Sequence, residues 1–361
     1  MANLKVGILT SGGDCSGLNA ALRGAAKAIY QKFGEDNVDI IGIHDGYYGL
    51  IHNICNRMKP DDFSGILTQG GTILGTRRTP YKQMQIIEDD KIDKVKCMKD
   101  TYKKQRFDCI LALGGNGTHK TANLLSEEGL NVISLPKTID NDIWGTDITF
   151  GFHTAVDVAT DAIDRIHTTA TSHSRIMIVE IMGNKAGWLA LYSGIAGGAD
   201  VILIPEIPYK IDKVIEACQH RADKGKPFSI VVVAEGAFDV EEAKLKKKER
   251  QKQRELNNET TVTYRIMKEV QKKTGLETRA VIPGHILRGG TPSAYDRILA
   301  TQFGSYAAQL ISQGNYGNAI AKINGKISHN PLSEVAHKTK FVPIDDDHVI
   351  TAKSIGISFG I

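Results

Sequence analysis

Short apolar runs that end in a glycine, a proline or an acidic residue recur along this chain, and helix-like segments separate them. They lie at residues 5–10, 38–43, 107–113, 132–135, 176–181, 201–204 and 230–234. Continuous apolar runs, unlike alternating ones, are typical of parallel strands that are buried on both faces. Strands of this kind that alternate with helices predict an α/β fold with mainly parallel sheets and helices on both faces of each sheet.

The length of 361 residues exceeds that of a typical single domain, so two lobes are expected. A natural boundary lies near residues 150–152, after an acidic loop. The stretch 240–262 differs from the rest because it is dense in charge and nearly free of apolar periodicity. This stretch predicts a solvated helix or a mobile excursion, and a basic docking surface is the alternative.

Charge and cysteine content bear on the class of protein. The 45 basic and 41 acidic residues give a net charge of +4, which is no argument for nucleic-acid binding and is compatible with a small polyanionic substrate. The five cysteines are dispersed, which indicates a reducing compartment and argues against a disulfide framework or a zinc site. Neither a signal peptide nor an apolar run of membrane-spanning length is recognised, so a soluble cytoplasmic protein is expected.

The run 135–142 places two carboxylates, Asp140 and Asp142, two positions apart behind an apolar strand. Pro136 bars a regular helix, so both are expected on a loop at a strand end, where open α/β sheets bind ligands. One carboxylate could accept a hydroxyl proton while the other faces a metal ion, a division that suits phosphoryl transfer to an alcohol. A charged surface turn is the alternative interpretation.

Two glycine turns, at residues 12–17 and 114–118, follow two other predicted strands. Each precedes a helical segment (120–125 for the second), so backbone N–H groups there could bind phosphate oxygens. Convergence of both turns at one sheet edge would favour a polyphosphate, although each turn alone could serve only a positive φ angle. Neither has the spacing of GxxxxGK[ST] or GxGxxG. Arg77 and Arg78 could clamp phosphate oxygens or form a surface basic pair.

The second half of the chain supplies groups suited to a phosphorylated sugar. Arg175 precedes one predicted strand, and Glu235 follows another. Arginines match a phosphate dianion in geometry and charge, and a carboxylate can accept hydrogen bonds from sugar hydroxyls. Arg279, His285 and Arg288 complete the set, with a satisfied core or turn histidine as the alternative for His285.

At this point the chain resembles the phosphofructokinase family over nearly its whole length. The most specific motifs are PKTIDND at 136–142 and GHILRGGTPSAYDR at 284–297. The resemblance implies 6-phosphofructokinase activity, in which the 1-hydroxyl of fructose 6-phosphate accepts a phosphoryl group from ATP. The product would be fructose 1,6-bisphosphate, in glycolysis. The resemblance is to the subgroup that mixes features of ATP-using and diphosphate-using members.

The family pattern also implies how the chain is divided. It implies two Rossmann-like three-layer lobes with the active site in the cleft between them. The lobe that binds the phosphoryl donor would be 1–150 with part of 283–325. The lobe that binds fructose 6-phosphate would be 151–282, and 326–361 would return to it.

Each matching residue receives an implied role. Asp140 would be the general base, with Lys137, Thr138 and Asp142 as further catalytic residues. Mg²⁺ would be the cofactor, bound near Asn116 and Asp142, and ATP the co-substrate. The implied donor-binding residues are Gly13, Arg78, Gly115, Asn116, Gly117 and Thr118. The implied substrate-binding residues are Thr138, Ile139, Asp140, Arg175, Met182, Gly183, Asn184, Glu235, Arg279, His285 and Arg288. Because the family's equivalents of Arg175 and Arg279 come from a neighbouring subunit, a homodimer or homotetramer with shared sites is implied.

Three positions bear on the donor and on activity. Asn116 stands where the family usually has an acidic residue that contacts Mg²⁺, and an amide offers an oxygen without charge. Gly117 matches ATP-using members, since a side chain there would fill space needed by the α-phosphate of the nucleotide, whereas Lys137 matches diphosphate-using members. We expect ATP as the donor, because a side chain that fills the space of a ligand excludes that ligand more firmly than an added flexible lysine does. A diphosphate-dependent enzyme is the alternative, and a non-catalytic sensor of nucleotide and sugar phosphate is a further one.

Overall fold

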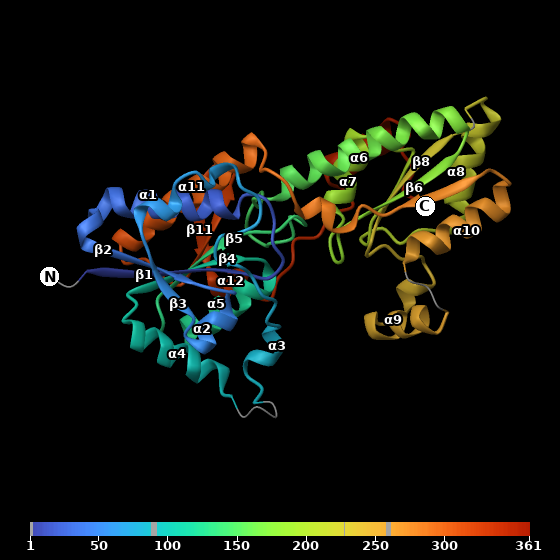
Figure 1. The fold of residues 1–361 in the computed structure, drawn as a ribbon. Coiled ribbons are helices and arrows are strands. Elements are labelled where there is room, and N and C mark those ends of the chain that lie inside the picture. The colour runs from blue at the N-terminus through green and yellow to red at the C-terminus, as the bar shows by residue number, and fades with distance from the viewer. Residues whose placement is uncertain (1–2, 88–91, 227, 258–260) are drawn as a thin grey trace. The chain divides into compact units, whose positions relative to one another are not determined.

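The computed structural model describes residues 3–87, 92–226, 228–257 and 261–361, and its fold is shown in Figure 1. The chain forms two compact units. One comprises Met1–Thr154 and Arg288–Lys340, and the other comprises Ala155–Leu287 and Phe341–Ile361. Each unit is built around its own sheet, so each is described by itself.

The sheet of the first unit has the order β11-β10-β5-β4-β1-β2-β3 in the described residues. Its inner strands are parallel, and β3 and β11 add antiparallel edges. The predicted α/β class with mainly parallel strands is confirmed. The bounds are β1 Leu4–Ser11, β2 Val38–Ile43, β3 Cys55–Met58, β4 Cys109–Gly114, β5 Val132–Pro136, β10 Asn318–Ile323 and β11 Lys326–Pro331.

Helices cover both faces of this sheet (Figure 1). On one face α1 packs against α11 so closely that a Cβ atom at Gly24 would meet the backbone of Thr301 at 2.8 Å. On the other face α2, α4, α5 and α12 contribute side chains to one core with the strands. The bounds are α1 Leu18–Phe33, α2 Tyr47–His52, α3 Tyr81–Met84, α4 Lys94–Gln105, α5 Asn116–Glu127, α11 Ala294–Ser312 and α12 Leu332–Val335, with short 3-10 turns at Glu35–Asn37, Pro60–Phe63 and Ile66–Thr68.

The second unit has a parallel sheet of order β7-β8-β6-β9 in the described residues. Val231 and Val233 on β8 share a core with α8 and α10. Val232 points the other way, since it and Ile202 lie against Gly194 of α7. This alternation places helices on both faces and gives three layers. The strand bounds are β6 Ile176–Ile181, β7 Val201–Leu203, β8 Ser229–Ala234 and β9 Thr278–Val281. The helix bounds are α6 Phe152–His173 (which begins in the first unit), α7 Trp188–Ala196, α8 Ile211–Asp223, α9 Lys247–Leu256, α10 Val262–Thr274 and α13 Asp347–Ser354, with 3-10 turns at Glu242–Lys244 and Gly284–Arg288.

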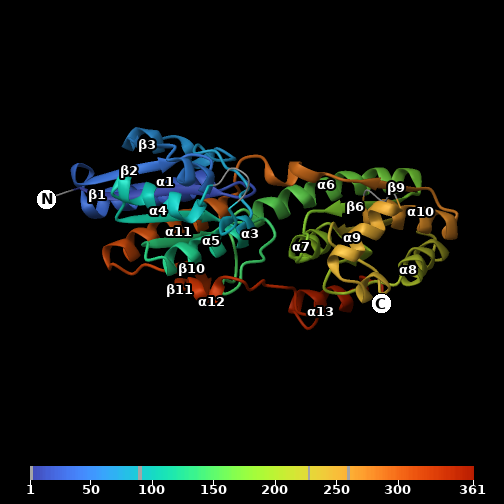
Figure 2. The ribbon, with the colours of Figure 1, turned by 90° about the horizontal axis from the view of Figure 1, so that it is seen from below.

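The expected boundary of the C-terminal segment is wrong. Residues 326–340 do not return to the second unit, because β11 pairs with β10 at the edge of the first sheet (Figure 2). The hairpin turns at Asn324 and Gly325, which both have positive φ, and Asn-Gly is the sequence that such a turn favours. The return to the second unit begins at Phe341. The charged stretch 240–262 contains α9, a helix without buried residues, so the predicted solvated helix is confirmed. Arg254 of this helix pairs with Glu242, and residues 258–260 lie outside the described part.

Two general observations concern the described part of the chain. None of its helices combines the length and the apolar character that crossing a membrane requires. All five cysteines are free thiols, and Cys15, Cys109 and Cys218 are buried.

Candidate active site

Three turns meet at the carboxyl edge of the first sheet. They follow the neighbouring parallel strands β1, β4 and β5, in which Ser11 is level with Gly114 and Gly114 is level with Pro136. The two glycine turns and the acidic loop therefore begin at the same height on adjacent strands. This register brings the two glycine turns to one edge of the sheet, as the binding of a polyphosphate requires.

Three cationic side chains surround Gly13 in the first turn. A Cβ atom at Gly13 would lie 2.8 Å from Nη1 of Arg288 and 3.4 Å from Nη2 of Arg78, so a larger residue would displace the guanidinium groups. Lys137 donates a hydrogen bond to the carbonyl oxygen of Gly13. Nε of Arg288 is buried and has no hydrogen-bond partner among the described residues. The cluster thus presents unsatisfied positive charge, which an anion would neutralise.

Arg77 and Arg78 take different positions. The Arg77 guanidinium lies over the ring of Tyr48, 4.0 Å from the ring centroid, whereas Arg78 lines the cavity with Gly13. Arg77 is therefore engaged in a cation–π contact. The sequence did not distinguish the two arginines.

Helix α5 begins at Asn116, earlier than the expected 120–125, and its first turn contains Gly117 and Thr118. N–H groups in the first turn of a helix have no partner within the helix and suit phosphate oxygens. A Cβ atom at Gly114 would lie 2.0 Å from the side chain of Thr118, so any larger residue at position 114 would displace Thr118. A Cβ atom at Gly117, in contrast, would meet no heavy atom within 4 Å. Position 117 therefore faces open space.

The acidic loop carries a buried lysine. Lys137 is 3% exposed, and burial lowers the pKa of its ammonium, while Cys15 and the nearby acidic groups Asp14 and Asp140 oppose that shift. A buried ammonium group is costly unless an anion compensates it. Beyond it, the backbone N–H of Asp140 donates to Oγ1 of Thr138 at 3.1 Å, which shapes the turn before the second carboxylate.

Asn116 holds Asp142. Its amide nitrogen donates to Oδ2 of Asp142 at 2.7 Å and to the backbone oxygen of the same residue at 3.2 Å. Asn141 has a positive φ of 50°, and its side-chain oxygen accepts a hydrogen bond from Lys340 at 2.9 Å. The position of Asp142 is therefore fixed by the start of α5, across the sheet edge from its own strand.

A cavity of about 330 Å³ lies at this edge of the sheet. The structure brings together these predicted residues: Gly13, Arg78, Gly115, Asn116, Gly117, Thr118, Lys137, Thr138, Asp140, Asp142 and Arg288. Ile139 does not line it, because its side chain is 1% exposed and packs in the core. Tyr47 and Tyr81 also line the cavity and were not predicted. The hydroxyl of Tyr47 donates to the backbone oxygen of Thr118 at 2.9 Å, a contact that no sequence pattern indicates.

The predicted substrate residues of the second unit lie at two opposite edges of its sheet. Glu277 binds Arg175 at 3.0 Å and Arg279 at 2.5 Å, next to the amino ends of β6 and β9. Met182, Gly183, Asn184 and Glu235 follow the carboxyl ends of β6 and β8 instead. Because β6 has 6 residues, it separates the two groups by about 20 Å at the usual rise per residue. His285 is exposed in the turn Gly284–Arg288.

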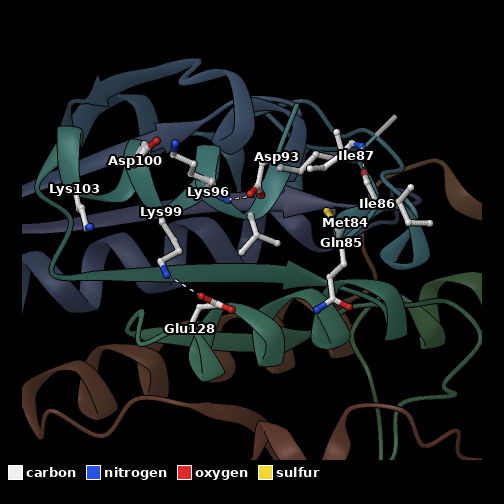
Figure 3. A pocket seen from close by; sticks show the side chains of 12 residues that line it. Met84, Gln85, Ile86, Ile87, Asp93, Lys96, Lys99, Asp100, Lys103 and Glu128 are labelled. Atoms are coloured by element: carbon white, nitrogen blue, oxygen red, sulfur yellow. Dashed lines mark hydrogen bonds and ion pairs between the residues drawn. The ribbon is translucent and has the colours of Figure 1, made fainter. Parts of the chain in front are cut away.

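A further cavity of about 530 Å³ in the first unit contains none of the predicted residues (Figure 3). Basic side chains of α4 line it, and two of them have partners. Lys99 pairs with Glu128 at 2.7 Å, and Lys94 donates to the backbone oxygen of Ile86 at 3.0 Å. No candidate chemistry is assigned to this cavity.

Comparison with known proteins gives one consistent family. A family-wide sequence profile described as Phosphofructokinase matches residues 5–311. The chain is 55% identical to an ATP-dependent 6-phosphofructokinase of Spirochaeta thermophila, covering 98% of this chain and 97% of that protein. It is 47% identical to ATP-dependent 6-phosphofructokinase 3 of Bacteroides thetaiotaomicron, covering 99% of this chain and 100% of that protein.

Solved structures show the same fold. Phosphofructokinase from Pichia pastoris in the T-state superposes with a TM-score of 0.79 at 31% identity, over 93% of this chain and 35% of that longer chain. A pyrophosphate-dependent phosphofructokinase from Marinobacter aquaeolei superposes with a TM-score of 0.80 at 21% identity, over 98% of this chain and 92% of that one. The second likeness concerns the fold alone.

Proposed function

This chain belongs to the phosphofructokinase family, and we propose that it is an ATP-dependent 6-phosphofructokinase, which forms fructose 1,6-bisphosphate from fructose 6-phosphate and ATP in glycolysis. The observation that carries the proposal is the cavity of the first unit. Its wall combines a carboxylate, Asp140, with the cations Arg78, Lys137 and Arg288 and with the start of α5. These are the groups that transfer of a phosphoryl group to an alcohol needs.

In this mechanism Asp140 accepts the proton of the sugar 1-hydroxyl as the hydroxyl oxygen attacks the terminal phosphorus of the donor. A base held at hydrogen-bond distance from the hydroxyl makes the oxygen a better nucleophile. Negative charge spreads over the phosphoryl oxygens in the transition state. The first-turn N–H groups of α5, together with Lys137 and the two arginines, bind those oxygens and stabilise that charge.

Mg²⁺ fits the residues of this site as a companion of the donor. In the described residues no group of three or more histidine, cysteine, aspartate or glutamate side chains could form a metal cage. Asp142 and the carbonyl oxygen of Asn116, whose NH₂ group is bound to Asp142, offer two oxygen ligands. Mg²⁺ prefers one or two carboxylates plus phosphate oxygens and water. When bound, the ion would neutralise charge on the phosphates.

Open space at Gly117 supports ATP as the donor. A nucleotide needs room beside the first turn of α5 for its α-phosphate, and the missing side chain leaves that room. Lys137, the feature that favours diphosphate, already binds the backbone of Gly13. It therefore contributes to the shape of the site with either donor.

The split of the second-unit residues supports a homo-oligomer with shared sites. Arg175 and Arg279 cannot bind the substrate that Glu235 binds within one second unit, because the sheet separates them. Supplied by a neighbouring subunit, both arginines would act on the 6-phosphate. A mixed oligomer of Asp140→Asn and Arg279→Ala subunits tests this at fructose 6-phosphate concentrations far below the raised KM of Arg279→Ala, where neither variant alone turns over well. Some sites of the mixed oligomer would combine an intact Asp140 with an intact Arg279 and regain activity. If mixing restores no activity, each site is built from one chain.

The test of the proposed function is an assay of the purified protein with Mg²⁺, fructose 6-phosphate and either ATP or diphosphate. We expect turnover with ATP, and a fall in kcat of roughly 10²–10⁴-fold for Asp140→Asn, the usual contribution of a positioned base. Turnover with diphosphate but not ATP would establish the alternative donor. Binding of both ligands without turnover would establish a sensor.

We also propose a cytoplasmic location, in keeping with five free thiols.

A further inference from the structure

The second unit contains a cavity of about 690 Å³ at the carboxyl edge of its sheet. Asn184 and Glu235 line it, in turns that follow the neighbouring strands β6 and β8. The turns are in contact: the N–H of Gly236 donates to the oxygen of Gly183 at 3.1 Å, and a Cβ atom at Gly236 would lie 2.3 Å from the oxygen of Asn184. The two turns that carry the carboxylate and the amide are therefore held side by side.

Helix α9 forms another part of the cavity wall. Lys247, Arg250 and Arg254 all line the cavity, and their spacing of three and then four residues places them on one face of the helix. Lys247 donates to Oδ1 of Asn184 at 2.6 Å, and the Arg250 guanidinium lies 3.8 Å from the ring centroid of Phe238. The face of α9 that lines the cavity consists of cations instead of apolar residues. Apolar periodicity in the sequence therefore does not predict that this face is turned toward the protein.

Glu242 joins α9 to α10. Its carboxylate accepts hydrogen bonds from Arg254 at 2.7 and 2.9 Å and from Arg265 at 2.6 Å. Burial alone would raise the pKa of Glu242, but the hydrogen bonds from Arg254 and Arg265 outweigh it and lower the pKa to about 2. Arg254 is therefore neutralised by this pair. The position of Lys247, seven residues earlier, is set by a rigid attachment.

The remaining charges of the wall are not balanced. Lys185, Lys247 and Arg250 have no carboxylate within 4.0 Å among the described residues, whereas Glu235 and Glu206 are the acidic groups of the wall. Glu206 is engaged, because it accepts hydrogen bonds from the backbone N–H groups of Gly187 and Val342. Burial and then the charges of Lys185 and Arg250 lower the pKa of Lys247. An anion in the cavity would relieve that repulsion.

The donor and acceptor pattern of the cavity also indicates its ligand. Since Oδ1 of Asn184 is bound to Lys247, the NH₂ group of Asn184 is the part left to donate to a ligand. Three cations and an amide donor suit phosphate or sugar oxygens, while the Glu235 carboxylate can accept a hydrogen bond from a hydroxyl. A molecule that carries both hydroxyl groups and a phosphate ester matches both features.

We propose that α9 completes the binding site for the phosphorylated sugar and that Lys247 is a substrate-binding residue whose ammonium binds a sugar or phosphate oxygen beside Asn184 and Glu235. The inference rests on the proposed function for the identity of the sugar, fructose 6-phosphate. It goes beyond the family motifs, because the charged stretch that contains α9 is part of none of them. It gives that stretch a role in acceptor recognition.

The test compares Lys247→Met with Lys248→Met, which removes an equal charge from a neighbouring exposed position outside the cavity. Lys247→Met should raise KM for fructose 6-phosphate about tenfold, the usual effect of losing one charged hydrogen bond. Both kcat and KM for ATP should stay within about twofold, because the contact exists in ground and transition states alike. Lys247→Arg should restore most of the affinity, and Lys248→Met should behave as the unchanged protein.

A second measurement separates this inference from the proposed function. Titration calorimetry with fructose 6-phosphate alone, without donor, should show binding weakened about tenfold by Lys247→Met. If the unchanged protein has no turnover, the proposed function fails, yet the calorimetry still decides the role of Lys247. The inference is overturned if the Met variants at 247 and 248 bind equally well. It is also overturned if Lys247→Met lowers the melting temperature and Lys247→Arg does not rescue binding, since the lysine would then only support the fold.

Discussion

Substitution of Gly117 by aspartate should separate stability from donor binding. A Cβ atom at this position meets no heavy atom within 4 Å, and the position lies in the first turn of α5. The backbone there is helical, so an L residue is accepted without strain. Replacing glycine in a helix and adding a carboxylate near the helix start each stabilise by roughly 0.3–1 kcal/mol. The melting temperature of Gly117→Asp should therefore stay equal or rise.

Donor binding should respond in the opposite direction. The new side chain would occupy space that faces the cavity, and its charge would oppose the donor phosphates. Two like charges about 5 Å apart repel by about 3 kcal/mol at an effective dielectric constant of about 20, which corresponds to roughly a hundredfold in affinity. We expect KM for ATP to rise by about that factor. If the protein also turns over diphosphate, which has no α-phosphate beyond the transferred unit and its leaving group, the KM for diphosphate should rise less.

The assay is steady-state kinetics with fructose 6-phosphate fixed and ATP varied, together with thermal unfolding of the same preparations. Gly117→Asn is the matched control, because it has nearly the same size as aspartate and no charge. Its KM for ATP measures the contribution of volume, and the difference between the variants measures that of charge. A KM for ATP that changes by less than about threefold in Gly117→Asp would refute the placement of the donor against the first turn of α5.

Three further results are expected. Arg279→Ala should raise KM for fructose 6-phosphate about 10–100-fold with kcat nearly unchanged, as for loss of a charged hydrogen bond, and an unchanged KM would remove Arg279 from the phosphate site. Asn116→Asp should replace the 2.7 Å hydrogen bond to Asp142 by repulsion between two carboxylates. The free energy of unfolding, measured thermally, should fall by roughly 2–4 kcal/mol, and added Mg²⁺ should reverse this loss. An equal effect of Mg²⁺ on the variant and on the unchanged protein would contradict the assignment of the metal site. Glu242→Gln should lose roughly 2–3 kcal/mol in urea unfolding at neutral pH. Because the pKa of Glu242 is lowered to about 2, the stabilisation from this carboxylate is complete above the ordinary pKa of a glutamate and disappears as pH falls toward 2. The free energies of unfolding of the variant and of the unchanged protein should therefore become equal near pH 2. A difference that persists at acid pH would argue against the ion pair.

The sequence predicted the central strands well because their apolar runs are continuous and end in glycine or proline. The same rule missed β3, β9, β10 and β11. β3 contains Asn56 and Arg57, which are exposed, and β11 is mostly half-exposed, so neither has a continuous apolar run. The Asn324-Gly325 turn was a usable signal for the β10–β11 hairpin, and its neglect led to the wrong boundary for the return to the second unit.

Part of the candidate site followed from local sequence, and part did not. Asp140, Asp142 and the glycine turns were identified because each lies directly after a strand, and the carboxyl ends of parallel strands share one edge. The approach of Arg288 to Gly13 and the capture of Asp142 by Asn116 join residues far apart in the chain. Such contacts depend on strand order and register, which one sequence read alone does not provide.

What the sequence itself determined is the set of local conformations and the chemistry available: strands that end in glycine, a proline-bounded acidic loop, and glycine where a side chain would collide. Tertiary structure alone decided which charges meet. It placed Arg77 on a tyrosine ring but Arg78 in the cavity, and it turned the cationic face of α9 toward Glu242 and Asn184. The physical reason is that backbone preferences act over only a few residues along the chain. A charge, in contrast, is stabilised by whichever partner the fold brings within a few ångströms, however distant that partner is in sequence.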